Sequence, residues 1–414
     1  MSDLISVKLG EIANFKYGKV ITKNDISLEG KYPVYSGYQI VGYLDEYQFE
    51  NEQLVIVCRG MGGTGDIKLS PRKCSITNLA IVISEDKTKV KQRYLYWVLK
   101  NSDTYSLRTG SAQPQITIHA LENFSICINP NLDIQDKISS ILDELDQKIE
   151  LNTQINQTLE QIVQTIFKSW FIDFDPVHAK ANALASGQTA EQATQAAMAV
   201  ISGKNSQELH RLQTANPEQY QQLWEIAEAF PSGFDEEGVP WGWEERYLKD
   251  VCNIVYGKGL PKNKLTEKGF YVFGANGVIG FYDSYTYEKP QVLIGCRGTV
   301  GQVTLSYPYS FVTNNSLVIE YENSCVSMYY LEKYLSNINL KEISSGSVQP
   351  QITIQNMSKV KILIPNIEIL NSYSEKVKEI YDKRLHHFYE NQSLSKVRDL
   401  LLPKLLSGEI LNGN

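Results

Sequence analysis

The sequence lacks the long apolar runs that mark membrane-spanning and secreted chains. No apolar stretch in its 414 residues reaches the ~18 residues that a membrane-spanning helix needs. No charged segment precedes a short apolar one near the start, as it would in a signal peptide. We therefore expect a cytoplasmic protein with no membrane span, no signal peptide and no membrane partner.

Cysteine and histidine are also scarce. The six cysteines show no CxxC spacing, and the five histidines do not cluster with them. A structural zinc site is therefore not predicted, and no other metal site is expected. Reduced, partly buried thiols in a reducing compartment are the simplest interpretation of these cysteines.

Catalytic motifs are missing as well. The chain has no Gly-x4-Gly-Lys-Ser/Thr loop for a nucleoside triphosphate and no Asn-Pro-Pro-Tyr motif for methylation of a base amino group. The glycines at 60, 62 and 65 match a dinucleotide fingerprint, but a strand-like stretch follows them where a helix is required. We interpret them as a glycine-rich hairpin and predict no catalytic residues; an enzyme would have to show activity from this chain alone.

Negative charge dominates the chain as a whole but not its globular parts. The net charge is −7. Residues 1–130 carry 15 Lys and Arg against 13 Asp and Glu, and residues 241–365 carry 12 against 10, so each region is +2. Residues 171–240 carry 3 against 10. The acidity lies outside the two globular regions, so it does not exclude nucleic acid as their partner.

A tandem repeat organises the chain. The first half contains FKYGK (15–19), VCRG (57–60), a Thr-Asn pair at 77–78 and GSAQPQITI (110–118). The second half repeats them in the same order as IVYGK, GCRG, a Thr-Asn pair at 313–314 and GSVQPQITI. Between these boxes, short β-rich runs alternate with turns, and one helix is expected in each half, at 93–103 and 328–337. Two tandem α+β units, each with a twisted sheet at its centre, are predicted.

Each unit is followed by a long amphipathic helix, at 131–170 and at about 366–406. Apolar residues recur at steps of three and four in both helices, and a shift of 235 superimposes them. Each helix would be about 55–60 Å long, and its natural partner is the other helix. Polar residues interrupt the stripes at Asn152 and His387, where they would define the register. The predicted interface consists of Ile138, Leu142, Leu145, Leu159, Ile162, Ile166, Tyr373, Val377, Ile380, Leu394, Val397 and Leu401.

The region between the units, 171–240, has no counterpart later in the chain. An Ala- and Gln-rich helix is expected at 179–200 and a second one at 217–230. Because the region is acidic, we expect a solvated or protein-docking surface there. The domains predicted are therefore 1–130, helix 131–170, a central linker region 171–240, 241–365, and 366–414 with the second helix.

The combination of these features resembles the specificity subunit of type I restriction–modification systems. The resemblance covers essentially the whole chain. It depends on KSWFIDFDPVHAKA at the join, PSGFDEEGVPWGWEERYLKDV before the second unit, the GSxQPQITI box before each helix, and LLLPKLLSGEI near the end. It implies two target-recognition domains joined by two long helices that pack as an antiparallel coiled coil.

That resemblance also implies a noncatalytic DNA-binding subunit. Each globular domain would read one half of a bipartite site in double-stranded DNA, with an unspecified spacer between the halves. The helices would dock two methyltransferase subunits, and motor–nuclease subunits would join them. S-adenosylmethionine, ATP and Mg²⁺ would be bound by those partners and not by this chain.

Residues shared by both halves cannot explain the reading of two different sequences, so they are expected to position the DNA backbone, while the divergent tips read bases. A purely structural role remains the alternative for each residue. The candidates are Lys19, Lys23, Asn24, Tyr35, Ser36, Tyr38, Arg59, Lys68, Thr77, Asn78, Lys258, Lys262, Asn263, Lys264, Asn276, Arg297, Thr299, Gln302, Thr313 and Asn314. The competing function is a protein-only coiled-coil scaffold, which would show no sequence preference for DNA.

Overall fold

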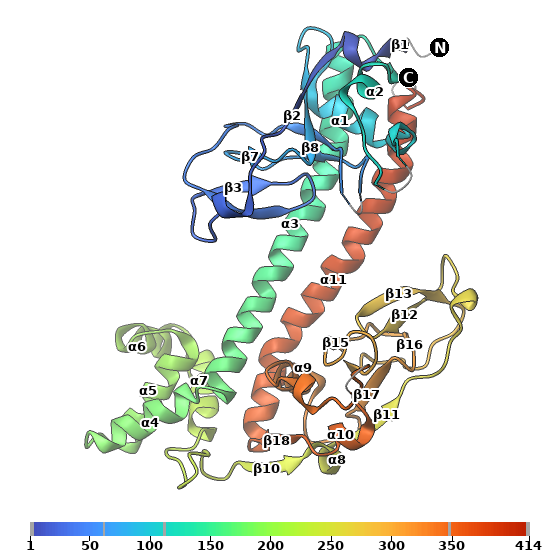
Figure 1. The fold of residues 1–414 in the computed structure, drawn as a ribbon. Helices are drawn as coiled ribbons and strands as arrows, with labels where there is room; N and C mark the ends of the chain where they lie inside the picture. The colour runs from blue at the N-terminus through green and yellow to red at the C-terminus, as the bar shows by residue number, and fades with distance from the viewer. Residues whose placement is uncertain (1–3, 61–62, 111–112, 347–348, 411–414) are drawn as a thin grey trace. The chain divides into compact units, whose positions relative to one another are not determined.

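The computed structural model describes residues 4–60, 63–110, 113–346 and 349–410 (Figure 1). The chain forms two compact units, Met1–Thr153 with Phe388–Asn414 and Gln154–His387. The two long helices, α3 (Leu132–Phe171) and α11 (Ile367–Leu406), have 40 residues each. Their bounds agree with the predicted ones within a residue or two. The sequence placed each helix in a region of its own, whereas each unit contains one globular domain and a half of both helices.

The globular domain of the first unit is built on three small sheets. The apolar strand β5 is buried along its whole length in the four-stranded antiparallel sheet, as an interior strand should be. In the three-stranded sheet, β3 pairs antiparallel with β4 and parallel with β7. The four-stranded order is β2 (Ala13–Tyr17), β8 (Ala80–Glu85), β5 (Leu54–Val57) and β6 (Ile67–Leu69); the three-stranded order is β4 (Ile40–Leu44), β3 (Tyr32–Tyr35) and β7 (Ser75–Ile76); and β1 (Ile5–Lys8) pairs with β9 (Ser125–Ile128).

The second unit repeats this topology strand for strand, which confirms the predicted tandem α+β repeat. Its buried interior strand β14 corresponds to β5. The four-stranded order is β11 (Asn253–Tyr256), β17 (Ser316–Glu320), β14 (Val292–Gly295) and β15 (Val303–Leu305); the three-stranded order is β13 (Gly277–Tyr282), β12 (Phe270–Gly274) and β16 (Phe311–Val312); and β10 (Glu244–Tyr247) pairs with β18 (Lys361–Ile364).

One main helix per domain covers the four-stranded sheet, as predicted. These are α1 (Gln92–Lys100) and α9 (Met328–Ser336). Shorter helices complete each domain: α2 (Ile118–Glu122) and the 3-10 helices η1 (Leu9–Glu11), η2 (Lys23–Asp25) and η3 (Thr104–Leu107) in the first, and α8 (Leu248–Val251), α10 (Ile354–Met357), η4 (Lys262–Lys264) and η5 (Leu340–Ile343) in the second.

The long helices pair antiparallel in both units. In the first unit, Asn152 donates to the Oδ1 atom of Asn391 over 2.8 Å. In the second unit, His387 Nδ1 lies 2.9 Å from Asn156 Oδ1. In each pair the two residue numbers add up to 543, as they should where two helices run antiparallel. Adding 235 to Asn152 gives His387, and adding 235 to Asn156 gives Asn391, so the repeat relates the two pairs. Asn152 and His387 are buried, at 0% and 7% exposure, so the predicted polar interruption of both stripes is present and matched across the helices.

The burial of the predicted interface residues varies along the two helices. Ile138 and Leu142 are fully buried in the first unit, as are Tyr373 and Val377 in the second. The residues that are partly buried are Leu145, Leu159, Ile166, Ile380, Leu394 and Leu401.

Ile162 and Val397 are exposed, at 42% and 45%, so their assignment to the interface is corrected. The more buried position is the following one, where Val163 of α3 is fully buried and Arg398 of α11 is partly buried. Arg398 pairs with Asp146 of α3. Apolar periodicity missed this position because in one copy it holds a charge that is neutralised by its partner.

The central region forms four helices where two were predicted. Gly187, at φ +79°, breaks the expected 179–200 helix into α4 (Asp175–Ala185) and α5 (Ala190–Ser202). The helix α6 (Ser206–Ala215) was not predicted, and α7 (Pro217–Ala229) was. Figure 1 shows all four beside the C-terminal end of α3. Lys180 closes this subdomain by donating to the carbonyl oxygens of Ala227, Glu228 and Phe230.

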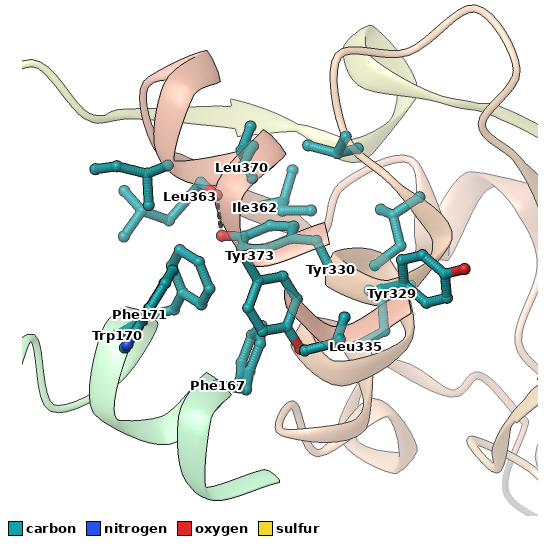
Figure 2. Close-up of a cluster of buried hydrophobic side chains, with 14 of the residues drawn as sticks. Phe167, Trp170, Phe171, Tyr329, Tyr330, Leu335, Ile362, Leu363, Leu370 and Tyr373 are labelled. Carbon is teal, nitrogen blue, oxygen red and sulfur yellow. Dashed lines mark hydrogen bonds between the residues drawn. The ribbon is translucent and has the colours of Figure 1, made fainter. Parts of the chain in front are cut away.

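An aromatic core anchors the end of α3 in the second unit. Phe167 and Phe171 of α3 pack against Tyr330 of α9 and Tyr373 of α11 (Figure 2). All four side chains are at most 1% exposed. The Tyr330 hydroxyl donates to the carbonyl of Leu363 in β18, which satisfies the polar end of that ring.

Candidate nucleic-acid interface

The YGK and Thr-Asn boxes cross each other in both domains through backbone contacts. A Cβ added at Gly18 would lie 2.2 Å from the carbonyl oxygen of Thr77. At Gly257 it would lie 2.3 Å from the carbonyl oxygen of Thr313. Only glycine fits such an approach. These boxes are shared because the fold requires them at this crossing.

The same crossing places a lysine and an asparagine next to each other. The backbone N–H of Asn78 donates to the backbone carbonyl of Lys19 over 2.9 Å. In the second domain, the backbone N–H of Asn314 donates to the backbone carbonyl of Lys258 over 3.1 Å. Both lysine side chains are exposed. The geometry is therefore equivalent in the two domains.

The CRG and QPQIT boxes meet at the same place. Cys58 N donates to the carbonyl of Leu79 over 2.9 Å, and its own carbonyl accepts from Ile116 N over 3.0 Å. The second domain repeats both bonds at Cys296, with Asn315 and Ile352. Burial raises the pKa of the Cys58 thiol to about 11, so this cysteine packs as a neutral side chain. Parts of the GSxQPQITI boxes, at 111–112 and 347–348, lie outside the described residues.

Each junction also carries an exposed arginine. Arg59 N donates to Leu79 O over 3.3 Å, and Arg297 N donates to Asn315 O over 3.4 Å. Together with the neighbouring residues they form what we call the Lys–Asn–Arg junction, which consists of Lys19, Asn78 and Arg59 in the first domain and Lys258, Asn314 and Arg297 in the second. Lysine, arginine and asparagine side chains are of the kinds that contact phosphate oxygens.

Four of the candidate residues are buried, and for these the predicted DNA contact is corrected. Thr77 and Thr313, at 6% and 3% exposure, lie inside the crossing. A β-bulge between Val34 and Tyr35 turns Tyr35 into the core, where it is 7% exposed and its hydroxyl donates to the carbonyl of Gly37. Ser36, at 2% exposure, donates to Gln39 O over 3.1 Å and closes the turn.

The remaining candidates are exposed and differ between the domains. Lys23 and Asn24 lie on η2, and their counterparts Lys262, Asn263 and Lys264 lie on η4. Around the Lys–Asn–Arg junction, the exposed candidates are Tyr38 and Lys68 in the first domain and Asn276, Thr299 and Gln302 in the second. Gly62 lies outside the described residues.

The structure adds functional candidates that the sequence did not indicate. Tyr105 and Arg108, on and after η3, lie against the loop before β6, because Tyr105 donates to the Asp66 carboxylate and Arg108 Nε donates to Thr64 O over 2.6 Å. In the second domain, Gly301 lies against Lys341. The sequence signal that could have identified Tyr105 and Arg108 was the segment before each QPQIT box. This segment aligns between the two halves but differs in sequence.

The enzyme-like features have structural explanations. The strand β6 follows the glycines at 60–65 directly, which confirms a hairpin and not a phosphate-binding helix start. Over the described ranges, no group of three His, Cys, Asp or Glu side chains could hold a metal ion.

Two further predictions can be compared with the structure. All six cysteines are free thiols; Cys58, Cys74, Cys252 and Cys296 are buried, and Cys127 and Cys325 are exposed. In the part of the chain that the structure describes, no helix is long and apolar enough to cross a membrane.

In the comparison with known proteins, the family match falls on both halves of the repeat. A family model described as the type I restriction modification DNA specificity domain matches residues 1–161 and 240–397. The type I restriction enzyme HindI specificity subunit of Haemophilus influenzae is 38% identical over 368 residues, which cover 80% of each chain. The type I restriction enzyme MjaIX specificity subunit of Methanocaldococcus jannaschii is 23% identical over 78% of this chain and 70% of its own.

The fold also matches a solved structure. The S subunit of a type I restriction–modification system from M. genitalium superimposes with a TM-score of 0.60 over 98% of this chain and 96% of that one. At 18% sequence identity, this match bears on the fold alone.

Proposed function

Because this chain belongs to the family of type I restriction–modification DNA specificity subunits, we propose that it reads a bipartite site in double-stranded DNA, one half with each globular domain. A spacer of unspecified sequence would separate the halves. The chain is the noncatalytic specificity subunit of its enzyme. The catalytic cofactors, S-adenosylmethionine, ATP and Mg²⁺, would be bound by the partner subunits.

One observation carries this proposal: the two domains present different exposed side chains on the same framework. Both have the Lys–Asn–Arg junction with the same backbone hydrogen bonds. Around it, Tyr38 corresponds to Asn276, and Asp66 corresponds to Gln302. A shared set of phosphate contacts would orient the duplex, and the differing residues would read different bases.

A domain exchange tests the division of labour. The chain is coexpressed with its methyltransferase subunits in a bacterial host without other adenine methylation, and methylated sites are mapped by long-read sequencing. Replacing residues 1–130 by the equivalent region of a relative should change one half of the methylated motif and preserve the other half. A change in both halves would contradict modular reading. A purified complex without sequence preference would favour the protein-only scaffold.

We further propose that the long helices and the acidic central helices dock the methyltransferase subunits. In the first unit, α3 exposes Ile141 and Leu151, at 38% and 50%, and α11 exposes Val397 and Leu400, at 45% and 60%. Exposed apolar side chains on packed helices are typical of a protein interface. They need a partner other than the opposite helix.

Substitution of these residues separates docking from folding. The double variant Leu151→Asp/Leu400→Asp should bind methyltransferase subunits at least tenfold more weakly, because it places charges in the proposed interface. Its thermal unfolding should be nearly unchanged, since both side chains are exposed in the chain alone. Size-exclusion chromatography of the coexpressed subunits measures the assembly. An intact complex would argue against this docking surface.

A further inference from the structure

Arg108 of the first domain is exposed and yet held rigidly. Its guanidinium lies over the ring of Tyr105, with Cζ 4.3 Å from the ring centroid. Its Nε atom donates to the carbonyl of Thr64 over 2.6 Å. An exposed arginine normally has many rotamers, and fixing it before a ligand arrives reduces the entropy lost on binding.

The support beneath Arg108 is itself fixed. The Tyr105 hydroxyl donates to the carboxylate of Asp66, which raises the pKa of Tyr105 and keeps the phenol protonated. Thr104, at 3% exposure, donates to the carbonyl of Gly65 over 2.7 Å. Gly65 has φ +102°, and a Cβ there would lie 2.8 Å from the Tyr105 ring. The loop therefore packs closely against one side of the Tyr105 ring.

The free end of Arg108 has the chemistry to read guanine. With Nε engaged by Thr64, the two terminal amino groups remain for a bidentate contact, and the O6 and N7 atoms of guanine are the usual acceptors in the major groove. Asp66, which shares Tyr105 with the arginine, carries a negative charge, and Lys68 Nζ lies 3.9 Å from its Oδ2. The carboxylate of Asp66 would repel a phosphate, which carries a full negative charge, more strongly than the uncharged edge of a base.

The second domain has no equivalent of this arrangement. The positions of Tyr105 and Arg108 hold Lys341 and Ser344, and the position of Asp66 holds Gln302. We propose that Arg108, stacked on Tyr105 and anchored by Thr64, forms a guanine-reading site of the first domain. This inference rests on the proposed function, and it assigns one base to one half of the site.

The test uses the complex with its methyltransferase subunits and a duplex library that is randomised over the first half-site. For the unaltered chain we expect one position to prefer guanine by about 5- to 150-fold over the other bases. Arg108→Gln should abolish that preference, and Arg108→Lys should retain only part of it, because lysine has no bidentate fork. Tyr105→Leu should weaken the same position. Arg72→Gln, an exposed arginine of the same domain without a ring or carbonyl partner among the described residues, is the matched control.

The results separate the possible contacts. Loss of preference at a single position of the first half-site, with the second half-site read as before, supports the guanine-reading site and shows that the variant complex is assembled. An unchanged motif in Arg108→Gln overturns it, as does an equal loss of binding to all sequences, which indicates a phosphate contact. A complex of the unaltered chain with no bipartite motif overturns the proposed function and this site with it.

Discussion

The two domains anchor their main helices to the long helices through the same position of the main helix but with different chemistry. In the first unit, the Trp97 indole of α1 donates to Asp143 over 2.8 Å, and Arg93 Nε donates to the same carboxylate over 2.8 Å. In the second unit, the position of Trp97 holds Lys333, whose side chain is 3% exposed and pairs with Glu160 and Glu332.

This difference shows that one repeated position of the main helix serves as an anchor in both domains, with different partners and different chemistry. Asp143 accepts from a neutral indole and from a partly exposed arginine, which also pairs with Glu52. A buried ammonium needs more partners, and the second unit supplies them: Arg384 also pairs with Glu160 over 2.6 Å, and Tyr381 donates to Glu332 over 2.6 Å. We therefore expect the second anchor to respond more strongly to the loss of one member.

The largest effect is expected from Lys333→Ala. Removing the buried ammonium takes one partner from each of two partly buried carboxylates, Glu160 and Glu332, which should cost about 3–5 kcal/mol of unfolding free energy. Lys333→Met, which keeps the apolar stem, should be nearly as destabilising, because the loss is one of charge. Chemical denaturation of the full chain measures both. Lys289→Ala, which removes an exposed pair with Glu322 at 3.4 Å, is the control and should cost at most about 1 kcal/mol. Equal losses of unfolding free energy in Lys333→Ala and Lys289→Ala would show that the buried network stabilises the chain no more than an exposed ion pair does.

Trp97→Phe should have the next largest effect. It removes a hydrogen bond to a charged acceptor, worth about 1.5–3 kcal/mol, while the ring itself stays in the core. The same denaturation experiment applies, with Trp241→Phe as the control, since Trp241 is 56% exposed. If Trp97→Phe were as mild as the control, Arg93 alone would hold Asp143 and α1.

Acid should weaken the second anchor through Glu160. Burial opposes ionisation of this carboxyl, but the charge and hydrogen bond of Lys333 and the charge of Arg384 outweigh it, so its pKa is lowered from 4.5. A lowered folded-state pKa means that the stabilisation is complete above the unfolded value and is lost as the pH falls below about 4.5. The unfolding free energy should therefore decline in that window, and Glu160→Gln should flatten the decline. An equal decline in both proteins would assign it to other groups.

The smallest effects should come from the shared junctions, where the two domains ought to behave alike. Lys19→Ala and Lys258→Ala should each weaken DNA binding by the complex for all sequences alike, and each should lower the slope of log affinity against log salt by about one. Lys137→Ala, on the exposed face of α3, should leave the slope unchanged. A change in the preferred sequence instead would mean that these lysines read bases.

Much of the fold was predictable because the two halves of the chain can be compared with each other. Boxes that recur at a nearly constant offset indicated two like domains, and the apolar periodicity at 131–170 and 366–406 indicated paired helices. The exposed or buried state of single residues was less predictable. The bulge that buries Tyr35 and the ion pair that hides Arg398 in the helix interface both depend on segments that are distant in sequence.

The sequence by itself determined the repeat, the helix pairing and the polar positions Asn152 and His387 that set its register, because periodicity and repetition are local properties of the chain. Only the tertiary structure decided which side chains surround the Lys–Asn–Arg junction and that Arg108 is stacked and anchored among them. The physical reason is that burial of a charge and orientation of a side chain depend on partners such as Thr64 and Asp66, which folding brings from elsewhere in the chain.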